Sequence, residues 1–558
     1  MKLRILPLSL VLAGVFLLTG CREKIMPPQV AQIIRSTVES ETLPVSIKEQ
    51  KERARAWDEM RRFYQKRQYQ PAWSEVGGPR PHAEQLVETL GSITTAEGLD
   101  PRRYHSTRLA GLLSQVKEQE SLESPEAQRR LADLDVELTF VYLTLAAHTA
   151  IGRVQPETLR VHWEDQSRNV DLDARLETTL QDKDGAVMES LRSLAPPNPR
   201  YARLRDALAR YREIAAKGGW PSVPAGLEMG ARGAGVLALR NRLAAEGDLA
   251  VPPAEEGQPA PPPVFDDAVA QAIARFQQRH GLDPDGKLGE GTLAELNVPV
   301  QDRIRQIELN LERWRWLPNS LGDSYIWVNV PEYRMELIDG GRKALDMAVV
   351  VGKQQSQTPV FSDQMEYLEL NPAWNIPTSI AEEEILPKQA SDPGYMARNN
   401  MEFVSSGGSQ RIRQRPGPDN PLGQVKFMFP NEHDVYLHDS PADHLFSREE
   451  RDFSHGCVRL ERPVQLAEYL LRDNPDWRGT RLREAIVSGE QRSIKLPKKL
   501  PVHILYFTAW VEDNGAIHFR KDVYGHDAKL AAALAQEPVV PLDLPALRGD
   551  VRAAVSSP

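Results

Sequence analysis

Two neighbouring motifs carry the residue types that acyl transfer needs. His438 is followed, after 15 residues, by Ser454-His455-Gly456-Cys457. Acyl transfer requires a thiolate that attacks a carbonyl carbon, a base that takes the thiol proton, and backbone N–H groups that face the developing oxyanion. Cys457 supplies the thiol, and Gly456 lets the backbone bend close to a substrate. The two segments are expected to be neighbouring strands that bring His438 beside Cys457.

A structural reading of the same residues competes with this one. A lone cysteine is most often a small buried hydrophobe, and a histidine is most often a surface or hydrogen-bonded core residue. The chain has only two cysteines, Cys21 and Cys457, and an unpaired thiol in a secreted protein calls for an explanation. The combination of residues therefore favours catalysis, with His438 and His455 both open as the base.

The N-terminus predicts secretion. A basic start and an apolar run over residues 5–18 are typical of a signal peptide, because a membrane-spanning helix needs about 20 apolar residues. Leu18-Thr19-Gly20-Cys21 resembles the lipobox of bacterial lipoproteins. The resemblance implies a signal peptide over residues 1–20, lipidation of Cys21, and a periplasmic protein anchored to the outer membrane. The alternative is an ordinary cleaved signal with an unrelated cysteine.

Composition excludes several classes of protein. Hydrophobic residues make up 41% and charged residues 26% of the 558 positions, which fits about three or four soluble domains. A net charge of −9 argues against a strongly basic nucleic-acid-binding protein. No cysteine and histidine stand at the spacing of a structural zinc site. We therefore expect no metal and no nucleic-acid partner.

Hydrophobic periodicity predicts a multidomain α+β fold. Helical spacing dominates the first half, and the period changes to two from about Tyr325. The predicted order is a tether over 21–50, a helical scaffold domain over 51–220, a small three-helix domain over 226–297, a linking helix over 298–321, a β-rich catalytic domain over 322–480 with an inserted lid over about 378–430, a C-terminal segment over 481–534, and a poorly ordered tail over 535–558.

The three-helix unit over 226–297 resembles a peptidoglycan-binding domain. Its recurring pattern, FQxxxGLxxDGxxGxxT, is matched by Phe276, Gln277, Gly281, Leu282, Asp285, Gly286, Gly289 and Thr292. Gly286 and Gly289 are expected to serve turns that need positive φ. The alternative is a structural spacer without a ligand.

The motif that contains Cys457 resembles the signature of L,D-transpeptidases with a YkuD-type catalytic domain. That signature is a histidine, a spacer of similar length, and Ser/Thr-His-Gly-Cys. The segments 371–377 and 416–423 are similar to the large multidomain, gammaproteobacterial branch of the family, although the lipobox departs from most of that branch. The resemblance implies a helical scaffold domain, a peptidoglycan-binding domain and a β-rich catalytic domain with a lid.

The resemblance also implies roles for individual residues. Cys457 is the nucleophile, and His438 is the general base, oriented by a backbone carbonyl near Asp439 or Ser440. The N–H groups around Gly456 and Cys457 form the oxyanion hole. The residues expected to line or support the substrate site are Tyr436, Arg459, Trp374, Asn375, Ser454 and His455.

Several of these roles have alternatives. Trp374 and Asn375 could instead pack in the core, and His455 is expected to be structural rather than the base. Arg459 stands where the family often has Asn, and it could contact a substrate carboxylate. The lid arginines Arg411, Arg413 and Arg415 are candidates for stem carboxylates or for a solvated basic loop.

The implied reaction joins two peptidoglycan stems without metal or organic cofactor. Cys457 attacks a tetrapeptide stem, D-alanine leaves, and an amine of a second stem resolves the thioester to give a 3-3 cross-link. Carbapenems are expected to inactivate such an enzyme, and a glycan polymerase and a D,D-carboxypeptidase are the partners that the family suggests. The alternatives are an L,D-carboxypeptidase, an enzyme that attaches lipoproteins to peptidoglycan or releases them, and an inert peptidoglycan-binding tether.

Overall fold

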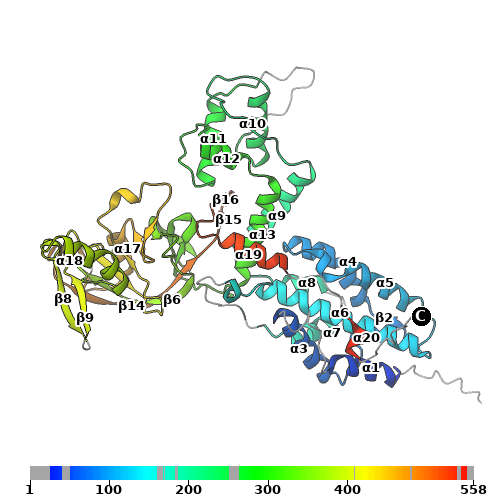
Figure 1. Ribbon diagram of the computed structural model, residues 1–558. Helices are drawn as coiled ribbons and strands as arrows, with labels where there is room; N and C mark the ends of the chain where they lie inside the picture. The colour runs from blue at the N-terminus through cyan, green and yellow to red at the C-terminus, as the bar shows by residue number, and fades with distance from the viewer. Residues whose placement is uncertain are drawn as a thin grey trace, which may run out of the picture.

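The computed structural model describes residues 26–40, 51–159, 168, 170–182, 187–250, 263–406, 409–477, 480–536 and 542–548. The expected signal peptide and Cys21 lie outside the described residues. Figure 1 shows three lobes: a helical domain drawn in blue to cyan, a small green lobe, and a β-rich yellow lobe. They meet around the helices α9 (Pro199–Ala216) and α13 (Val300–Arg315).

The helical domain is built around one buried helix, α6. Ser124 caps its N-terminus by accepting a hydrogen bond from Ala127 N–H, and Gly152, with φ +87°, ends it. The elements of this domain are α1 (Pro28–Val38), α3 (Lys51–Lys66), β1 (Ser74–Glu75), β2 (Gly78–Pro79), α4 (Pro81–Ala96), η1 (Pro101–Tyr104), α5 (Ser106–Lys117), α6 (Pro125–Ile151), η2 (Pro156–Leu159), α7 (Leu172–Gln181) and α8 (Val187–Arg192).

Helix α6 is long and apolar enough to span a membrane, but 94% of its most apolar window is buried within the protein. It is the central core helix that its dense apolar spacing predicts. The predicted tether over 21–50 also contributes to this domain, which differs from the expectation. Val30, Ile34 and Val38 of α1 lie at four-residue intervals and are fully buried against the domain.

The small lobe contains α10 (Ala234–Ala245), α11 (Asp267–Arg279) and α12 (Glu290–Leu296). Gln277, 2% exposed, donates to Asp285, Thr292 and the Lys287 carbonyl, and it accepts from Gly286 N–H. The polar residues of the recurring pattern therefore hold the loop between α11 and α12.

The two glycines expected to need positive φ differ. Gly286 has φ +71°, and a Cβ there would lie 2.9 Å from the Ala270 carbonyl oxygen. The expectation for Gly289 is wrong, because this residue is the extended N-cap of α12 with φ −67°.

The β-rich lobe holds a nine-stranded sheet with the order β12-β5-β13-β11-β10-β6-β14-β3-β4. Pairing of β4 with β5 closes eight of these strands into a ring. The elements are β3 (Tyr325–Asn329), η3 (Val330–Glu332), β4 (Arg334–Asp339), β5 (Arg342–Gly352), β6 (Phe361–Leu370), β10 (Val425–Met428), β11 (Leu437–His438), η5 (Asp443–Leu445), β12 (Asp452–Ser454), β13 (Val458–Leu460), α17 (Pro463–Leu470), α18 (Arg481–Val487) and β14 (Arg492–Leu505).

This topology moves two predicted boundaries. Strand β14 lies between β6 and β3, so the catalytic sheet continues to Leu505 instead of ending at about 480. Strand β10 is also part of the sheet, so the lid, defined here as residues 371–424, ends before it instead of at about 430. Long-range strand pairing decides both boundaries, and local periodicity carries no information on it.

The lid has its own three-stranded sheet, β7-β9-β8, and a small core. Its elements are β7 (Trp374–Asn375), α14 (Thr378–Ile380), the π-helical turn η4 (Ala381–Ile385), α15 (Leu386–Ser391), α16 (Tyr395–Arg398), β8 (Met401–Ser406) and β9 (Ser409–Gln414).

The C-terminal segment connects the lobes. It forms β15 (Ala509–Val511), β16 (Ile517–Phe519), α19 (His526–Gln536) and α20 (Leu544–Leu547). Arg279 of the small lobe donates to the Ile517 carbonyl over 2.8 Å, and His280 stacks on Phe519 with ring centroids 5.6 Å apart. The small lobe is therefore docked on β16.

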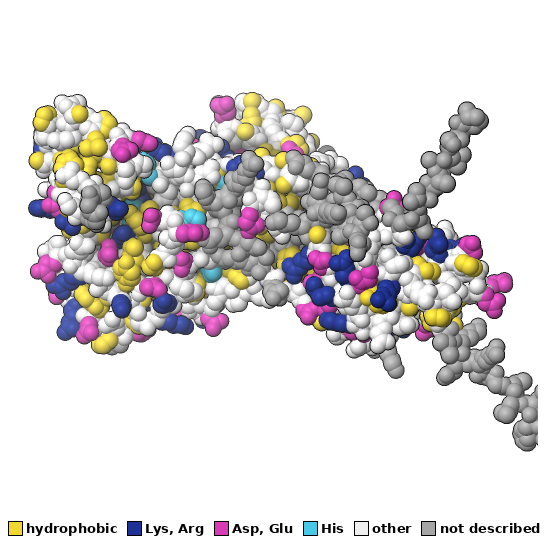
Figure 2. Space-filling view, turned by 60° about the horizontal axis from the view of Figure 1, so that its bottom comes forward, with side chains coloured by type: hydrophobic (Ala, Val, Ile, Leu, Met, Phe, Trp, Pro, Cys, Tyr) yellow, Lys and Arg dark blue, Asp and Glu magenta, His cyan; other side chains and the backbone are white. Residues whose placement is uncertain are grey.

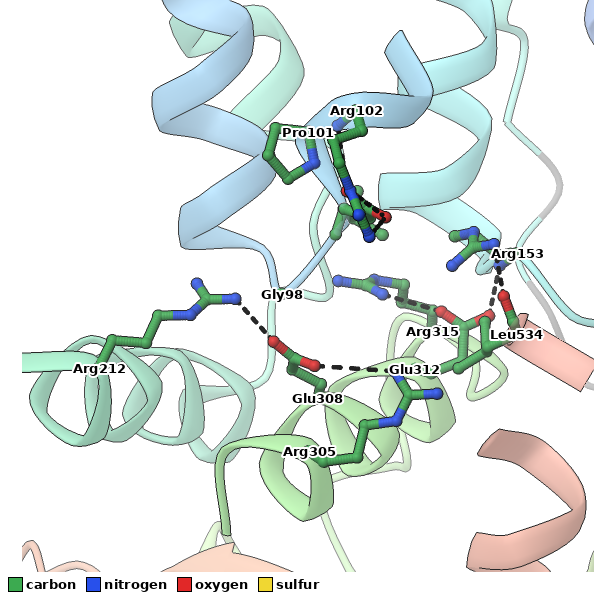
Figure 3. A pocket seen from close by; sticks show the side chains of 12 residues that line it. Gly98, Pro101, Arg102, Arg153, Arg212, Arg305, Glu308, Glu312, Arg315 and Leu534 are labelled. Carbon is green, nitrogen blue, oxygen red and sulfur yellow. Dashed lines mark hydrogen bonds and ion pairs between the residues drawn. The ribbon is translucent and has the colours of Figure 1, made fainter. Parts of the chain in front are cut away.

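A cavity of about 290 Å³ lies where the helical domain, α9, α13 and α19 meet (Figure 3). Arg212 and Arg305 both face Glu308, at 2.7 Å and 3.9 Å, and Arg315 contacts Glu312 at 2.9 Å. Arginines and carboxylates thus form ion pairs at this joint between domains.

The described part of the tail is packed, contrary to the expectation of poor order for 535–558. Leu542, Leu544 and Leu547 are buried in the core of the helical domain. Arg548 pairs with Asp133 of α6 at 2.5 Å. Few apolar residues in an Ala- and Pro-rich stretch are enough to dock it, because each one is buried completely.

We expect Leu544→Ala to lower the free energy of unfolding of the helical domain by about 2 kcal/mol, because it removes a fully buried side chain. Denaturant unfolding followed by circular dichroism measures this loss. Val487→Ala, at a position 86% exposed, is the matched control and should leave stability unchanged. Equal stability of the two variants would contradict docking of the tail.

Candidate active site

Strand pairing brings the two sequence motifs together, as expected. β11 pairs with β13 in parallel, with His438 opposite Arg459, and with β10 in antiparallel, with His438 opposite Lys426. Side chains directly opposite one another on neighbouring strands share a face of the sheet. Lys426, His438 and Arg459 therefore form one row, and Cys457 lies immediately before β13.

Hydrogen bonds hold the loop that carries Cys457. Ser454 Oγ donates to the Cys457 carbonyl over 2.6 Å and accepts from Gly456 N–H over 3.1 Å. Thr358 Oγ1 donates to the Gly456 carbonyl over 2.8 Å. Gly456 has φ +118°, a conformation that favours glycine. Ser454 therefore shapes the loop instead of facing a substrate.

The imidazole of His438 is held in the tautomer that a base needs. Its Nδ1 lies 2.5 Å from the Asp439 carbonyl oxygen, the kind of contact that was expected just after His438. A carbonyl only accepts, so Nδ1 carries the proton and Nε2 keeps its lone pair. The ring is 4% exposed, and burial, together with the charge of Arg459, lowers the pKa of His438 to about 3. His438 is therefore neutral at pH 7.

The thiol of Cys457 is partly exposed and donates to the Asp434 carbonyl over 3.8 Å. Burial raises the pKa of Cys457, whereas contacts with Tyr436 and the charges of Lys426 and Arg459 act in the opposite direction. The resting pair is thus a neutral thiol and a neutral imidazole. The thiol proton has to turn from Asp434 to His438, and such contacts often tighten only when a substrate binds.

Backbone N–H groups around Cys457 are the candidates for stabilising an oxyanion. Gly456 N–H is already bonded to Ser454 Oγ. Cys457 N–H has no acceptor within the part of the chain that the structure describes. The Cys457 amide is therefore the better candidate of the two.

His455 faces the lid. Its Nε2 lies 2.9 Å from Glu384 of η4 and 3.5 Å from Lys353 Nζ. This arrangement fits the supporting role expected for His455 and leaves His438 as the candidate base.

The remaining predicted residues are spread between the site and the lid. Tyr436 stands two positions before His438, with ring centroids 5.6 Å apart. Trp374 packs against the lid core, which supports the packing alternative for it, and Asn375 is exposed opposite Arg413.

Of the lid arginines Arg411, Arg413 and Arg415, two have a partner within the lid. Arg413 and Arg415 both pair with Glu402, at 2.6 Å and 2.5 Å, and Arg411 is exposed on β9. The pairs with Glu402 leave Arg413 and Arg415 less available for a stem carboxylate than the sequence suggested.

Sequence reasoning missed Lys426 and Thr358. Both stand in ordinary strand or loop contexts, and only pairing across the sheet and a contact with the Gly456 carbonyl place them at the site. Figure 2 shows a face on which acidic and basic side chains are intermixed, without a single basic patch.

Family comparisons agree with the three lobes. Residues 58–208 match the "Scaffold domain", 232–296 the "Putative peptidoglycan binding domain", and 323–502 the "L,D-transpeptidase catalytic domain" named YkuD. The site described above lies within the last of these segments.

A curated relative carries a similar name. A protein of Haemophilus influenzae named "Putative L,D-transpeptidase" is 33% identical over 246 residues, covering 41% of this chain and 49% of that protein. The chain thus spans about half the length of this curated relative.

Matches among solved structures include two related enzymes. An L,D-transpeptidase from Xylanimonas cellulosilytica is 17% identical with a TM-score of 0.17, covering 51% of this chain and 100% of its own. The Ldtfm–avibactam carbamoyl enzyme is 15% identical with a TM-score of 0.17, covering 34% and 51%. Superpositions this loose add nothing to the comparison of folds.

The fold is that of a multidomain protein, and three of its segments match domain families. The chain thus carries a segment similar to the L,D-transpeptidase catalytic domain of the YkuD type, preceded by segments similar to a scaffold domain and a peptidoglycan-binding domain. These domains imply a location at the cell wall or in the periplasm.

Proposed function

We propose that this protein forms 3-3 cross-links in peptidoglycan through a thioester on Cys457. The observation that carries the proposal is the row of His438 and Arg459 on adjacent strands, with Cys457 directly before the second strand. His438 is neutral, and its Nδ1 is held by the Asp439 carbonyl, so Nε2 is able to accept the thiol proton.

The first half-reaction acylates the enzyme. His438 Nε2 takes the thiol proton, and Cys457 Sγ attacks the carbonyl carbon of the third residue of a tetrapeptide stem. Cys457 N–H stabilises the oxyanion. The C–N bond to the terminal D-alanine breaks, and His438 returns the proton to the leaving amine. The product of this step is a thioester.

The second half-reaction depends on the acceptor. The side-chain amine of a second stem attacks the thioester, His438 takes its proton, and the C–S bond breaks to release the cross-linked product and the thiol. Water as acceptor would make the protein an L,D-carboxypeptidase. A lid joined to the catalytic loop through Glu384 and His455 favours an amine, because a covered site excludes water.

The test is incubation of the full mature chain with disaccharide-tetrapeptides, followed by mass spectrometry of the products. We expect a dimer that has lost one D-alanine. Tripeptide monomers alone would overturn cross-linking in favour of the carboxypeptidase. A carbapenem adduct on Cys457, located by peptide mapping, is expected independently of the acceptor.

We also propose that the protein is an outer-membrane lipoprotein anchored through Cys21. The support is the lipobox-like Leu18-Thr19-Gly20-Cys21, which lies outside the described residues. Acyl chains on Cys21 would give stable attachment. Intact-mass spectrometry of the detergent-extracted protein should show the lipid mass on a chain that begins at Cys21. An unmodified N-terminus would contradict the anchor.

The peptidoglycan-binding domain is proposed to hold the enzyme on its substrate. Its polar pattern residues support the loop between α11 and α12, so a ligand surface would lie on residues other than Gln277. A glycan polymerase and a D,D-carboxypeptidase remain proposed partners, because the second would produce tetrapeptide donors.

A further inference from the structure

Lys426 is a cation beside the nucleophile with unused hydrogen-bond donors. Its Nζ lies 3.9 Å from the ring centroid of Tyr436, and the side chain is half-buried. Among the described residues, no carboxylate lies within 4.0 Å of this ammonium group and no hydrogen bond engages it, although the charges of Glu369, opposite on β6, and of Asp434 act on it from farther away. A lysine ammonium group has three donors, and a ring face uses none of them fully.

Arg459 supplies a second cation on the other side of His438. The side chain is half-buried, and its Nε is buried without a hydrogen-bond partner in the described part of the chain. Because Lys426 and Arg459 both stand opposite His438, the two cations flank the base on one face of the sheet. Cys457 stands immediately before β13, two residues before Arg459.

Two half-buried cations without a carboxylate in direct contact, among the described residues, are costly to maintain; Glu369 and Asp434 act on Lys426 only from a distance. Burial lowers the pKa of Lys426 and of Arg459, which shows that their charged forms lose solvation at this place. A bound anion would replace the lost solvation. A carboxylate fits best, since ammonium and guanidinium groups both donate strong, charge-assisted hydrogen bonds to it.

We infer that Lys426, together with Arg459, binds the terminal carboxylate of the donor peptide and so places its last peptide bond at Cys457. This inference rests on the proposed function, since it assigns a part of the same donor. The terminal carboxylate belongs to the residue that leaves. Binding of this carboxylate selects donors with a free C-terminal residue. Because the carboxylate is part of the leaving residue, it departs from Lys426 and Arg459 with that residue.

The test separates binding from turnover. Isothermal titration calorimetry on the full mature chain with Cys457→Ala compares a stem tetrapeptide with the same peptide carrying a C-terminal amide. We expect the amide to bind about 10- to 100-fold more weakly, the usual effect of losing a hydrogen bond between charged groups. Adding Lys426→Met should weaken the free acid by a similar factor and leave the amide nearly unchanged.

Three control substitutions test whether the loss of binding is due to the charge of Lys426. Met keeps the apolar contact with the Tyr436 ring, and Lys426→Arg should restore part of the preference for the free acid. Lys495→Met, an exposed lysine on β14, should preserve the full preference. Equal binding of acid and amide by the Cys457→Ala protein would overturn the carboxylate site. So would a preference that survives Lys426→Met.

Failure of this inference and failure of the proposed function give different results. If the protein discriminates acid from amide in binding but forms no dimer and no tripeptide, the carboxylate site stands and the reaction is wrong. If it forms the dimer from acid and amide donors at equal rates, the reaction stands and Lys426 has another role. Thermal unfolding followed by circular dichroism, expected to stay within a few degrees of the wild-type protein, reports that the Lys426→Met protein is folded.

Discussion

Replacing Cys457 by alanine is expected to lower the rate of stem-dimer formation by at least about 10³-fold. No other thiol is available among the described residues, and the proposed reaction splits into two easier steps only if a covalent intermediate forms. Product analysis by mass spectrometry under single-turnover conditions measures the effect. The wild-type protein should also gain the mass of an acyl group, and the variant should not.

The matched control for this prediction is Cys457→Ser, which keeps the shape of the side chain. Its hydroxyl is a far weaker nucleophile near neutral pH, so the same loss is expected. The partly exposed position of Cys457 predicts that both variants unfold within a few degrees of the wild-type protein. Cross-linking that persists in a folded Cys457→Ala protein would rule out the thioester.

Replacing His438 by glutamine is expected to reduce kcat/KM by about 10²- to 10⁴-fold, because the variant loses the group that accepts the thiol proton. The glutamine amide keeps a donor for the Asp439 carbonyl, so the strand pairing of β11 should survive. His455→Gln is the matched control, since this histidine faces Glu384. A loss in His455→Gln that equals the loss in His438→Gln would contradict the assignment of the base.

The pH dependence gives a second readout for His438. Its pKa of about 3 means that the imidazole stays neutral from pH 5 to pH 8, so kcat/KM should show no acid limb near the ordinary histidine value of about 6.5. An acid limb near 6.5 that disappears in His438→Gln would contradict the buried, neutral base.

The same shift predicts how stability depends on pH. The unfolded chain binds a proton at His438 below about pH 6.5, whereas the folded chain does so only below about 3. The contribution of the neutral His438 to the free energy of unfolding is therefore fully present above pH 6.5. It is lost as the pH falls from 6.5 toward 3. In denaturant titrations, the free energy of unfolding of His438→Gln should fall less between pH 6.5 and pH 3 than that of the wild-type protein. An equal fall in both proteins would count against the lowered pKa of His438.

Local signals in the sequence were enough to predict the character of each lobe. The dense apolar run around Leu138 predicted a buried core helix, and α6 is that helix. The change to a period of two predicted the strands that follow Tyr325. These signals are local, since helices and strands place neighbouring residues on defined faces.

Contacts between distant segments could not be predicted in this way. Strands β10 and β14 join the sheet through partners far away in the chain, and α1 and α20 are short apolar pieces among polar or proline-rich residues. Their hydrophobic patterns are too brief to distinguish a packed element from a linker.

For the site, the sequence by itself indicated the pair that is proposed to react. The spacing between His438 and Ser454-His455-Gly456-Cys457 is a local property, and the chemistry of thiol and imidazole follows from residue type. Residue type alone left both histidines open as the base. The tertiary structure supports His438, which the family resemblance implies, because His438 is buried beside the Asp439 carbonyl whereas His455 reaches Glu384 in the lid. It also decided that Lys426 belongs to the site, because cross-strand register, set by the whole closed sheet, places it opposite His438.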